Sequence, residues 1–210
     1  MKLLIGIPSL DFVHVEFVKS LLALTARLTW EQVPHDVFVC NGTLAHVARD
    51  RVACKAINEG YTHVLWLDAD MVFAPEIFDD LLDTGKDFVT GIAVSRRPPF
   101  MYCVFKSLDF ERGQQNYEDA EIPHETFRVA GCGFACVLIT TEILRQVHQA
   151  HKTCFLPGHN TGEDLAFCKR AADLGHEIWA EPTVRLGHIG HIAVWPEDHQ
   201  RYMEQLKRGE

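Results

Sequence analysis

The 210-residue chain has no cluster of lysine and arginine and no long apolar run. Its 29 acidic residues outnumber its 20 basic residues, and the net charge of -9 argues against nucleic acid as a partner. No apolar run reaches the length of a membrane span, and the apolar run in the opening MKLLIGIPSLD is too short for a signal peptide. We therefore expect no transmembrane segment and no secretory leader.

Linkers, repeats and low-complexity tracts are missing as well. Without a Gly/Ser tether, and with 47% hydrophobic residues, the whole chain (1–210) is expected to fold as one domain around one sizeable core. The seven cysteines are odd in number and lie in apolar segments, which indicates reduced core thiols and not a disulfide framework. Reduced thiols predict a cytoplasmic protein.

Apolar strands alternate with helical patterns through the first half of the chain. The expected strands cover residues 3–7, 37–40, 63–67 and 88–94. The expected helices cover residues 13–28, with Asp11 as the cap, 44–58 and 75–82. Such alternation is typical of an α/β fold with a mainly parallel central sheet flanked by helices.

The pattern becomes less regular after Ser95. Strands are expected at 101–106, 127–130 and 177–180, together with a strand and a helix that follow the turn Gly131-Cys132-Gly133-Phe134. A helix is expected from Thr161 to Gly175, and a polar helix after Pro196. The polar segment 111–125 is expected to be a loop that acts as a mobile lid or a binding edge. This second half is therefore α+β.

Two carboxylates stand at the end of the third predicted strand, in VLWLDADMVF. In open α/β sheets ligands bind outside the carboxyl ends of the strands, so Asp68 and Asp70 are expected to face a cleft. Carboxylate oxygens are the ligands that Mg²⁺ and Mn²⁺ prefer, and these ions bridge the phosphates of a nucleotide. The alternative is that the two acids only cap the turn before Met71.

A second acidic pair, Glu163-Asp164, opens a predicted helix. Negative charge is favourable at a helix N-terminus, and Thr161 with Asp164 three residues on is close to a capping box. Capping is one interpretation of this pair. The other is a general base that takes the proton from a bound hydroxyl.

Two histidines, His188 and His191, follow the last predicted strand of the second half. An imidazole nitrogen can complete the shell of a borderline metal ion, and either ring can equally be an ordinary core or surface histidine. A structural zinc site with cysteines is disfavoured, because Cys132 and Cys136 on one strand would lie about 13 Å apart at about 3.3 Å per residue.

In their order and spacing these motifs resemble the nucleotide-sugar-dependent glycosyltransferases of the GT-A fold, and their family two in particular. The resemblance runs from Ile5 to His191 and depends on Asp68-Ala69-Asp70, the turn 131–134, Gly162-Glu163-Asp164 and Leu186-Gly187-His188. It implies a Rossmann-like GT-A fold with a nucleotide-binding half (1–95) and a smaller acceptor-binding half (96–210).

The resemblance also implies roles for individual residues. Asp70 and His188, with His191 as the alternative to His188, would hold Mn²⁺ or Mg²⁺, and Asp68 would contact the ribose or belong to the metal shell. Asp164, with Glu163 as its neighbour or substitute, would be the general base of an inverting enzyme. The donor, a UDP or GDP sugar, would contact Pro8, Ser9, Asn41, Arg49 (or Arg51), Asp68, Gly131, Cys132 and Gly133, and Phe134 would line the sugar and acceptor pocket.

The chain departs from the family pattern in two places. Cys40-Asn41 stands where many members of family two place an aspartate for the base, and the Gln-x-x-Arg-Trp signature of processive synthases is absent, which favours transfer of a single sugar to an acceptor hydroxyl. A sugar-phosphate nucleotidyltransferase is a rival, but its glycine-rich loop and arginine are missing from IPSLD. Two further rivals are a non-catalytic nucleotide-sugar-binding module of the same fold and a scaffold with incidental acids.

Overall fold

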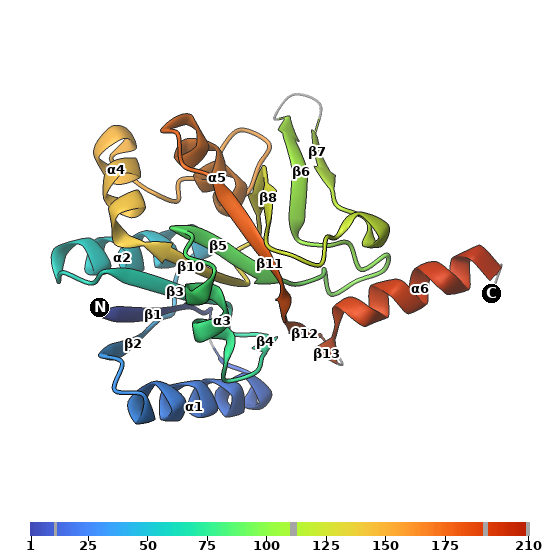
Figure 1. Cartoon of the computed structure of the whole chain (residues 1–210). Helices are drawn as coiled ribbons and strands as arrows, with labels where there is room; N and C mark the ends of the chain where they lie inside the picture. The colour runs from blue at the N-terminus through green and yellow to red at the C-terminus, as the bar shows by residue number, and fades with distance from the viewer. Residues whose placement is uncertain (11, 110–112, 191–192, 209–210) are drawn as a thin grey trace.

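A computed structural model describes the chain except for residues 11, 110–112, 191–192 and 209–210 (Figure 1). Its central layer is a seven-stranded sheet in the order β2-β1-β3-β10-β5-β11-β8. The strands of this sheet are β1 (Leu3–Pro8), β2 (His35–Cys40), β3 (His63–Leu67), β5 (Phe88–Ile92), β8 (Phe127–Val129), β10 (Cys136–Thr140) and β11 (Ile178–Arg185). β10 and β8 run antiparallel to the other five strands, so the predicted α/β fold with a mainly parallel sheet is confirmed.

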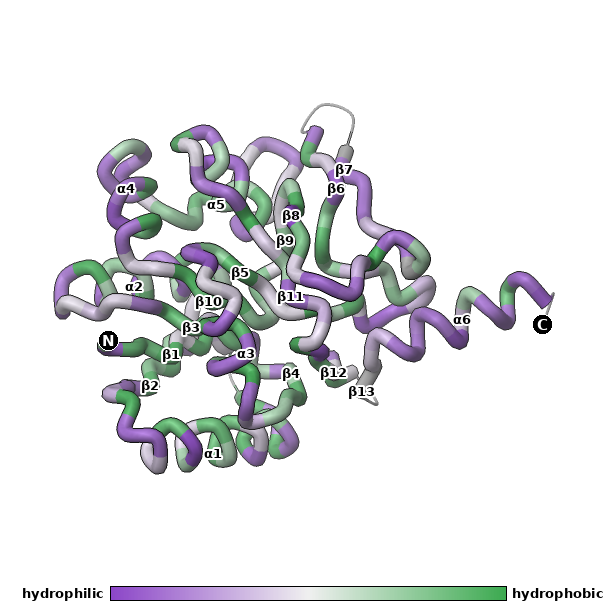
Figure 2. Tube along the Cα trace, in the orientation of Figure 1, coloured by the Kyte–Doolittle hydropathy of each residue, from purple (hydrophilic) through white to green (hydrophobic). Residues whose placement is uncertain are grey.

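Helices cover both faces of this sheet. α1 (Val15–Trp30) and α3 (Ile77–Asp83) pack on one face, and α2 (Ala45–Asn58), α4 (Thr141–His151) and α5 (Glu163–Asp173) pack on the other. β1 is buried along its whole length, because a strand with helices on both faces needs apolar side chains on both (Figure 2). α6 (Pro196–Arg208) projects from the body in Figure 1.

Two small sheets flank the central one. The first contains β4 (Met71–Val72), β12 (Gly187–Ile189) and β13 (Ala193–Val194), and the second contains β6 (Val104–Asp109), β7 (Gly113–Asn116) and β9 (Gly131–Cys132). β4 directly follows Asp70, and its pairing with β12 brings Gly187 and His188 to the end of β3. The first small sheet therefore lies beside the carboxyl edge of the central sheet, where the acidic motifs are.

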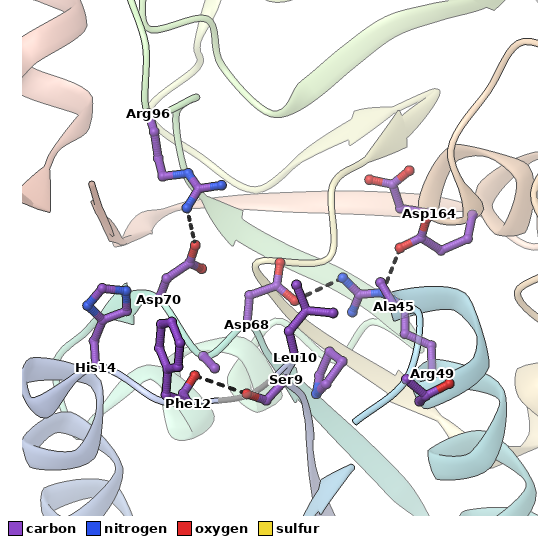
Figure 3. A pocket seen from close by; sticks show the side chains of 14 residues that line it. Ser9, Leu10, Phe12, His14, Ala45, Arg49, Asp68, Asp70, Arg96 and Asp164 are labelled. Carbon is purple, nitrogen blue, oxygen red and sulfur yellow. Dashed lines mark hydrogen bonds and ion pairs between the residues drawn. The ribbon is translucent and has the colours of Figure 1, made fainter. Parts of the chain in front are cut away.

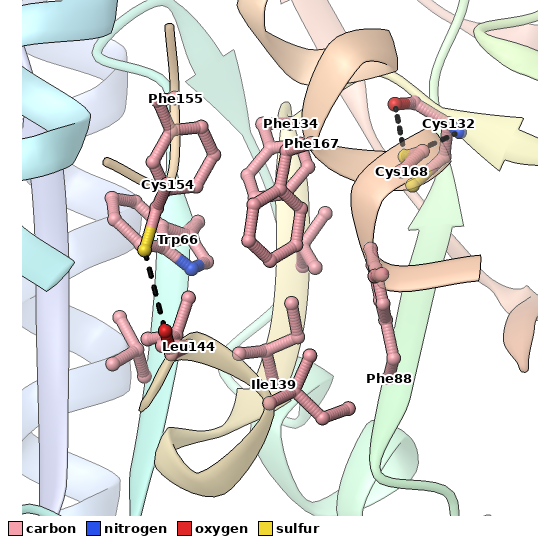
Figure 4. Packing of buried hydrophobic residues seen from close by; sticks show 14 of the residues in the cluster. Trp66, Phe88, Cys132, Phe134, Ile139, Leu144, Cys154, Phe155, Phe167 and Cys168 are labelled. Carbon is pink, nitrogen blue, oxygen red and sulfur yellow. Dashed lines mark hydrogen bonds between the residues drawn. The ribbon is translucent and has the colours of Figure 1, made fainter. Parts of the chain in front are cut away.

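A cluster of buried aromatic rings lies under α5 (Figure 4). Phe155 and Phe167 stack with ring centroids 4.6 Å apart, and Phe134 makes edge contacts to both at 5.1 and 5.5 Å. Trp66 at the end of β3 contacts Phe134 and Phe155. Aromatic pairs of this kind stabilise a core through both burial and ring geometry. The cluster fixes the first turn of α5 relative to the end of β3.

Glycines permit the closest contacts between layers. A Cβ atom at Gly6 would lie 2.5 Å from Cγ1 of Val52, so α2 approaches β1 more closely than any larger residue allows. A Cβ atom at Gly91 would lie 2.6 Å from Cγ1 and 2.9 Å from the carbonyl oxygen of Val184. Both glycines lie within the central sheet, so its packing depends on their missing side chains.

Several local expectations need correction. The segment 111–125, expected to be a loop, contains β7, which pairs with β6 as a hairpin, and the 3₁₀ turn Asp119–Glu121. Polar residues form a strand here because the hairpin is half exposed and Tyr117 still packs on Phe127, at 5.1 Å between ring centroids. Asp11, the predicted helix cap, lies outside the described residues, and α1 begins at Val15 with no side-chain cap from His14.

The seven cysteines are all free thiols, as predicted. Within the part of the chain that the structure describes, none of the helices combines the length and the apolar character needed to cross a membrane.

Candidate functional site

A cavity of about 510 Å³ opens at the carboxyl ends of β1 and β3, between the first turns of α2 and α5 (Figure 3). This is the edge at which α/β sheets bind ligands. The residues that line it come from the loops after β1, β2, β3 and β5, from α2 and from the start of α5: Pro8, Ser9, Leu10, Phe12, His14, Thr43, Ala45, Arg49, Asp68, Ala69, Asp70, Arg96, Glu163 and Asp164.

Asp68 and Asp70 lie in the turn between β3 and β4. Backbone groups close this turn, since the Met71 N–H donates to the carbonyl oxygen of Asp68 at 3.2 Å. The two carboxylates are instead paired with side chains in the cavity: Asp68 with Arg49, and Asp70 with Arg96 and His188. These contacts do not support the interpretation that the acids only cap the turn.

Arg49 on α2 connects three elements of the site. Its Nη2 lies 2.8 Å from Oδ1 of Asp68, and its Nε lies 3.3 Å from Oε1 of Glu163. The guanidinium also lies over the ring of Phe134, 5.2 Å from the centroid, and only 5% of the residue is exposed. Burial by itself lowers the pKa of Arg49, but the neighbouring carboxylates outweigh burial and raise it. Arg49 is therefore a permanently charged link between α2, β3 and α5.

The two acids at the start of α5 differ in their partners. Glu163 is paired with Arg49, whereas Asp164 accepts a hydrogen bond from the Leu165 N–H at 2.7 Å and, among the described residues, has no ion-pair partner. Burial raises the pKa of Asp164, and the charges of Glu163 and Asp68 add to this, against the Leu165 N–H and Arg49. The capping-box interpretation of Thr161 and Asp164, one of the two alternatives for this pair, is wrong, because the N-cap residue is Gly162, which has no side chain to act as a cap.

Asp70 faces His188 across the small sheet of β4 and β12. Oδ2 of Asp70 lies 3.3 Å from Nε2 of His188 and 3.0 Å from Nη1 of Arg96. On the other side of the ring, Nδ1 of His188 lies 2.8 Å from the Val94 carbonyl oxygen. Burial by itself raises the pKa of Asp70, but the hydrogen bond and charge of His188 and the charge of Arg96 outweigh burial and lower it.

Of the three predicted metal ligands, Asp68, Asp70 and His188, the structure thus brings only two together. Asp70 and His188 are adjacent, but the Asp68 carboxylate is directed to Arg49, and the described residues contain no group of three His, Cys, Asp or Glu side chains that could hold a metal ion by themselves. His191, the alternative to His188, lies outside the described residues.

The remaining predicted residues are divided between the cavity and other places. Pro8 and Ser9 line the cavity, and so does Arg49, whereas Arg51 is exposed elsewhere on α2. Asn41 is exposed after β2 and is not among the lining residues.

The glycine turn before β10 lies mostly beneath α5. Gly131 and Cys132 are buried, and a Cβ atom at Gly131 would lie 2.7 Å from Cδ1 of Leu108. Gly133 lies at the site, since a Cβ atom there would be 3.7 Å from Oδ2 of Asp164. Phe134 is buried in the aromatic cluster.

Sequence reasoning missed seven residues of the cavity wall: Leu10, Phe12, His14, Thr43, Ala45, Ala69 and Arg96. Phe12 is 80% exposed and Leu10 is 65% exposed, so the cavity has an apolar rim on the loop after β1. Leu10, Phe12, His14 and Arg96 could have been predicted from their place in the chain, because the loops after β1 and β5 both leave parallel strands at the same edge of the sheet.

No protein-family model and no curated protein matches the chain. Among solved structures, A197 from STIV matches with a TM-score of 0.67 and 20% identity, over 94% of this chain and 92% of that one. A Drosophila β-1,4-galactosyltransferase 7 mutant, in complex with manganese, UDP-Gal and xylobiose, matches with a TM-score of 0.51 and 15% identity, over 90% of this chain and 71% of that one. At these identities the likeness shows the fold: an α/β architecture that a glycosyltransferase also has.

Proposed function

We propose that the protein is a glycosyltransferase that moves one sugar from a nucleoside-diphosphate sugar to an acceptor hydroxyl, with the help of a divalent metal ion. The observation that carries the proposal is the pair Asp70 and His188 at one side of the cavity, with Asp164 on another wall of the same cavity. The fold likeness to a UDP-sugar transferase supports it. The seven free thiols support the cytoplasm as the compartment of this activity.

The donor atoms at Asp70 and His188 fit a metal ion. A carbonyl oxygen only accepts hydrogen bonds, so the contact with Val94 places the hydrogen of a neutral His188 ring on Nδ1 and leaves a lone pair on Nε2. That lone pair faces a carboxylate oxygen of Asp70 at 3.3 Å. Two acceptors this close require a cation or a second ring proton between them. A carboxylate with an imidazole suits Mn²⁺ better than Mg²⁺, which prefers oxygen ligands.

The charges of the cavity also favour a metal-dependent donor. Four carboxylates, Asp68, Asp70, Glu163 and Asp164, line it together with two guanidiniums, those of Arg49 and Arg96. A diphosphate would be repelled by this excess of negative charge unless a further cation entered with it. A divalent ion bound by Asp70 and His188 would neutralise the negative charge that develops on the leaving diphosphate.

Asp164 is the residue we assign as general base. In the transfer step the acceptor oxygen bonds to the anomeric carbon, its proton moves to a carboxylate oxygen of Asp164, and the bond to the diphosphate breaks with its electron pair on the diphosphate. The raised pKa of Asp164 makes its carboxylate a better proton acceptor than an ordinary aspartate. Glu163 is less suited to this role because Arg49 holds it.

The test is a panel of UDP and GDP sugars, with and without Mn²⁺, read by thermal stabilisation and by release of the free sugar or its transfer to trial acceptors. Wild type is compared with Asp70→Asn, Asp164→Asn and Glu163→Gln. A donor should raise the melting temperature by mass action only when Mn²⁺ is present, and Asp70→Asn should abolish this shift. Asp164→Asn should keep the shift and lose turnover, whereas Glu163→Gln should retain part of the turnover.

Two results would contradict the proposal. If no donor stabilises the wild-type protein at any Mn²⁺ concentration, the cavity does not bind nucleotide sugars. If a donor binds with Mn²⁺ but is never turned over, the protein is a non-catalytic nucleotide-sugar-binding module of the same fold.

A further inference from the structure

Arg96 occupies the place of a cation beside the carboxylate that we assign to the metal. It follows β5 in the loop that leads to β6, lines the cavity, and has Nη1 3.0 Å from Oδ2 of Asp70. The same oxygen faces Nε2 of His188 at 3.3 Å. A metal ion held by Asp70 and His188 would therefore compete with the guanidinium of Arg96 for one carboxylate oxygen (Figure 3).

The two guanidiniums of the cavity wall differ in their freedom to move. The Arg49 side chain is 6% exposed and paired with two carboxylates, whereas the Arg96 side chain is 52% exposed and paired with Asp70 alone among the described residues. An ion pair at that exposure contributes little to stability, so Arg96 can exchange its partner at small cost. Arg49 cannot do so without uncovering Asp68 and Glu163.

The backbone that carries Arg96 is fixed on both sides. The Ser95 N–H donates to the Met101 carbonyl oxygen at 2.8 Å, and the Phe100 N–H donates to the Arg97 carbonyl oxygen at 2.9 Å. The Ser95 hydroxyl also donates to the Arg97 carbonyl oxygen at 3.1 Å. A change of partner therefore requires rotation of the Arg96 side chain and leaves the loop in place.

We infer that Arg96 binds two partners in turn: Asp70 in the ligand-free protein, and the diphosphate of the donor once a divalent ion has taken Asp70. This inference rests on the proposed function. The planar guanidinium matches the geometry of phosphate oxygens, and its charge adds to that of the metal ion in a cavity rich in carboxylates. Arg96 thus acts as a substrate-binding residue that metal binding releases.

The inference predicts effects of opposite sign on two ligands. Arg96→Gln removes the competitor for Asp70, so the affinity for Mn²⁺ without nucleotide should rise roughly twofold to fivefold, the range expected from the loss of an exposed ion pair. The same variant should lose about tenfold or more in affinity for UDP or GDP at saturating Mn²⁺, the range of one charge-assisted hydrogen bond. Weakening of the structure alone would lower both affinities.

Arg97→Gln is the matched control, because it removes the same charge from the next residue, which does not line the cavity. Mn²⁺ binding is measured from the electron paramagnetic resonance signal of the free ion, and binding of UDP and GDP by calorimetry. We expect Arg97→Gln to match wild type and Arg96→Lys to recover part of the nucleotide affinity.

The outcomes separate this inference from the proposed function. If wild type binds Mn²⁺ and a nucleotide but Arg96→Gln behaves like Arg97→Gln, or loses affinity for both ligands, the role of Arg96 is overturned and the proposed function stands. If wild type binds neither ligand, both are overturned together.

Discussion

Arg49 offers the sharpest test of how the site is held together. Replacing it as Arg49→Met keeps most of the buried chain but leaves Asp68 and Glu163 without their cation. Removing one partner of a buried ion pair costs about 3–5 kcal/mol. The side chains of Asp68 and Glu163 are 31% and 20% exposed, so water can partly solvate them. We therefore take the lower end of this range, about 3 kcal/mol.

A loss of about 3 kcal/mol should lower the melting temperature by roughly 6–12 °C in a chain of this length. Thermal and urea unfolding of wild type, Arg49→Met and the exposed control Arg51→Met measure it. Combining Arg49→Met with Asp68→Asn and Glu163→Gln removes the unpaired charges, so the triple variant should be more stable than Arg49→Met alone.

The pH dependence gives an independent check on the same reasoning. The deficit of Arg49→Met should shrink as the pH falls toward about 4, because burial raises the pKa of Asp68 and Arg49 opposes that rise, so without Arg49 the Asp68 carboxylate takes up a proton in the folded chain before an ordinary aspartate does. The reasoning is refuted if Arg49→Met melts within 2 °C of Arg51→Met, by the scale of roughly 2–4 °C per kcal/mol, or if the triple variant is no more stable than the single one.

Three further predictions concern Asp164 and Gly91. Because the pKa of Asp164 is raised, the transfer rate should begin to fall, as the pH is lowered, at a pH where an ordinary aspartate, with a pKa of about 3.9, is still ionised. A pH–rate profile whose acid limb lies at or below that value would contradict this prediction. The stability of the fold depends on pH in the opposite direction. Protonated Asp164 favours the folded state, and this contribution is lost as the pH rises through the raised pKa. Asp164→Asn should therefore have a higher melting temperature than wild type at pH 7 and the same melting temperature at acidic pH. Gly91→Ala should cost about 1–3 kcal/mol, because its methyl group would meet Val184 at 2.6 Å; unchanged urea unfolding would show that β11 can move away.

The first half of the fold could be predicted because its signals are local. Apolar runs such as Leu3–Pro8 and His63–Leu67 are bounded by turn residues and alternate with helical patterns, and this is the signature of parallel strands buried on both faces. The positions of Asp68 and Asp70 follow from the same pattern, since the end of a parallel strand is the edge of the sheet where ligands bind.

The rest of the site depends on contacts between residues far apart in the chain. Nothing near Arg49 in the sequence indicates that it pairs with Glu163, which lies 114 residues away. The local sequence around Gly131 and Cys132 predicts a turn at a pocket. In the structure Leu108 and Cys168 pack against these two residues, so they lie in the core. The β6–β7 hairpin was missed because its outer strand is polar and has no apolar alternation.

The position of β10 has a consequence for how the chain is made. β3 and β5 are separated in the sequence by only 20 residues, from Asp68 to Asp87, but β10 lies between them in the sheet and is hydrogen-bonded to both. While a ribosome has made only the first 95 residues, β3 and β5 each present an unpaired edge that attracts other strands. The gap between β3 and β5 closes only when Thr140 has left the ribosome, and the other edge of β5 stays unpaired until β11 has been made. We therefore expect a fragment that ends at Ser95 to aggregate.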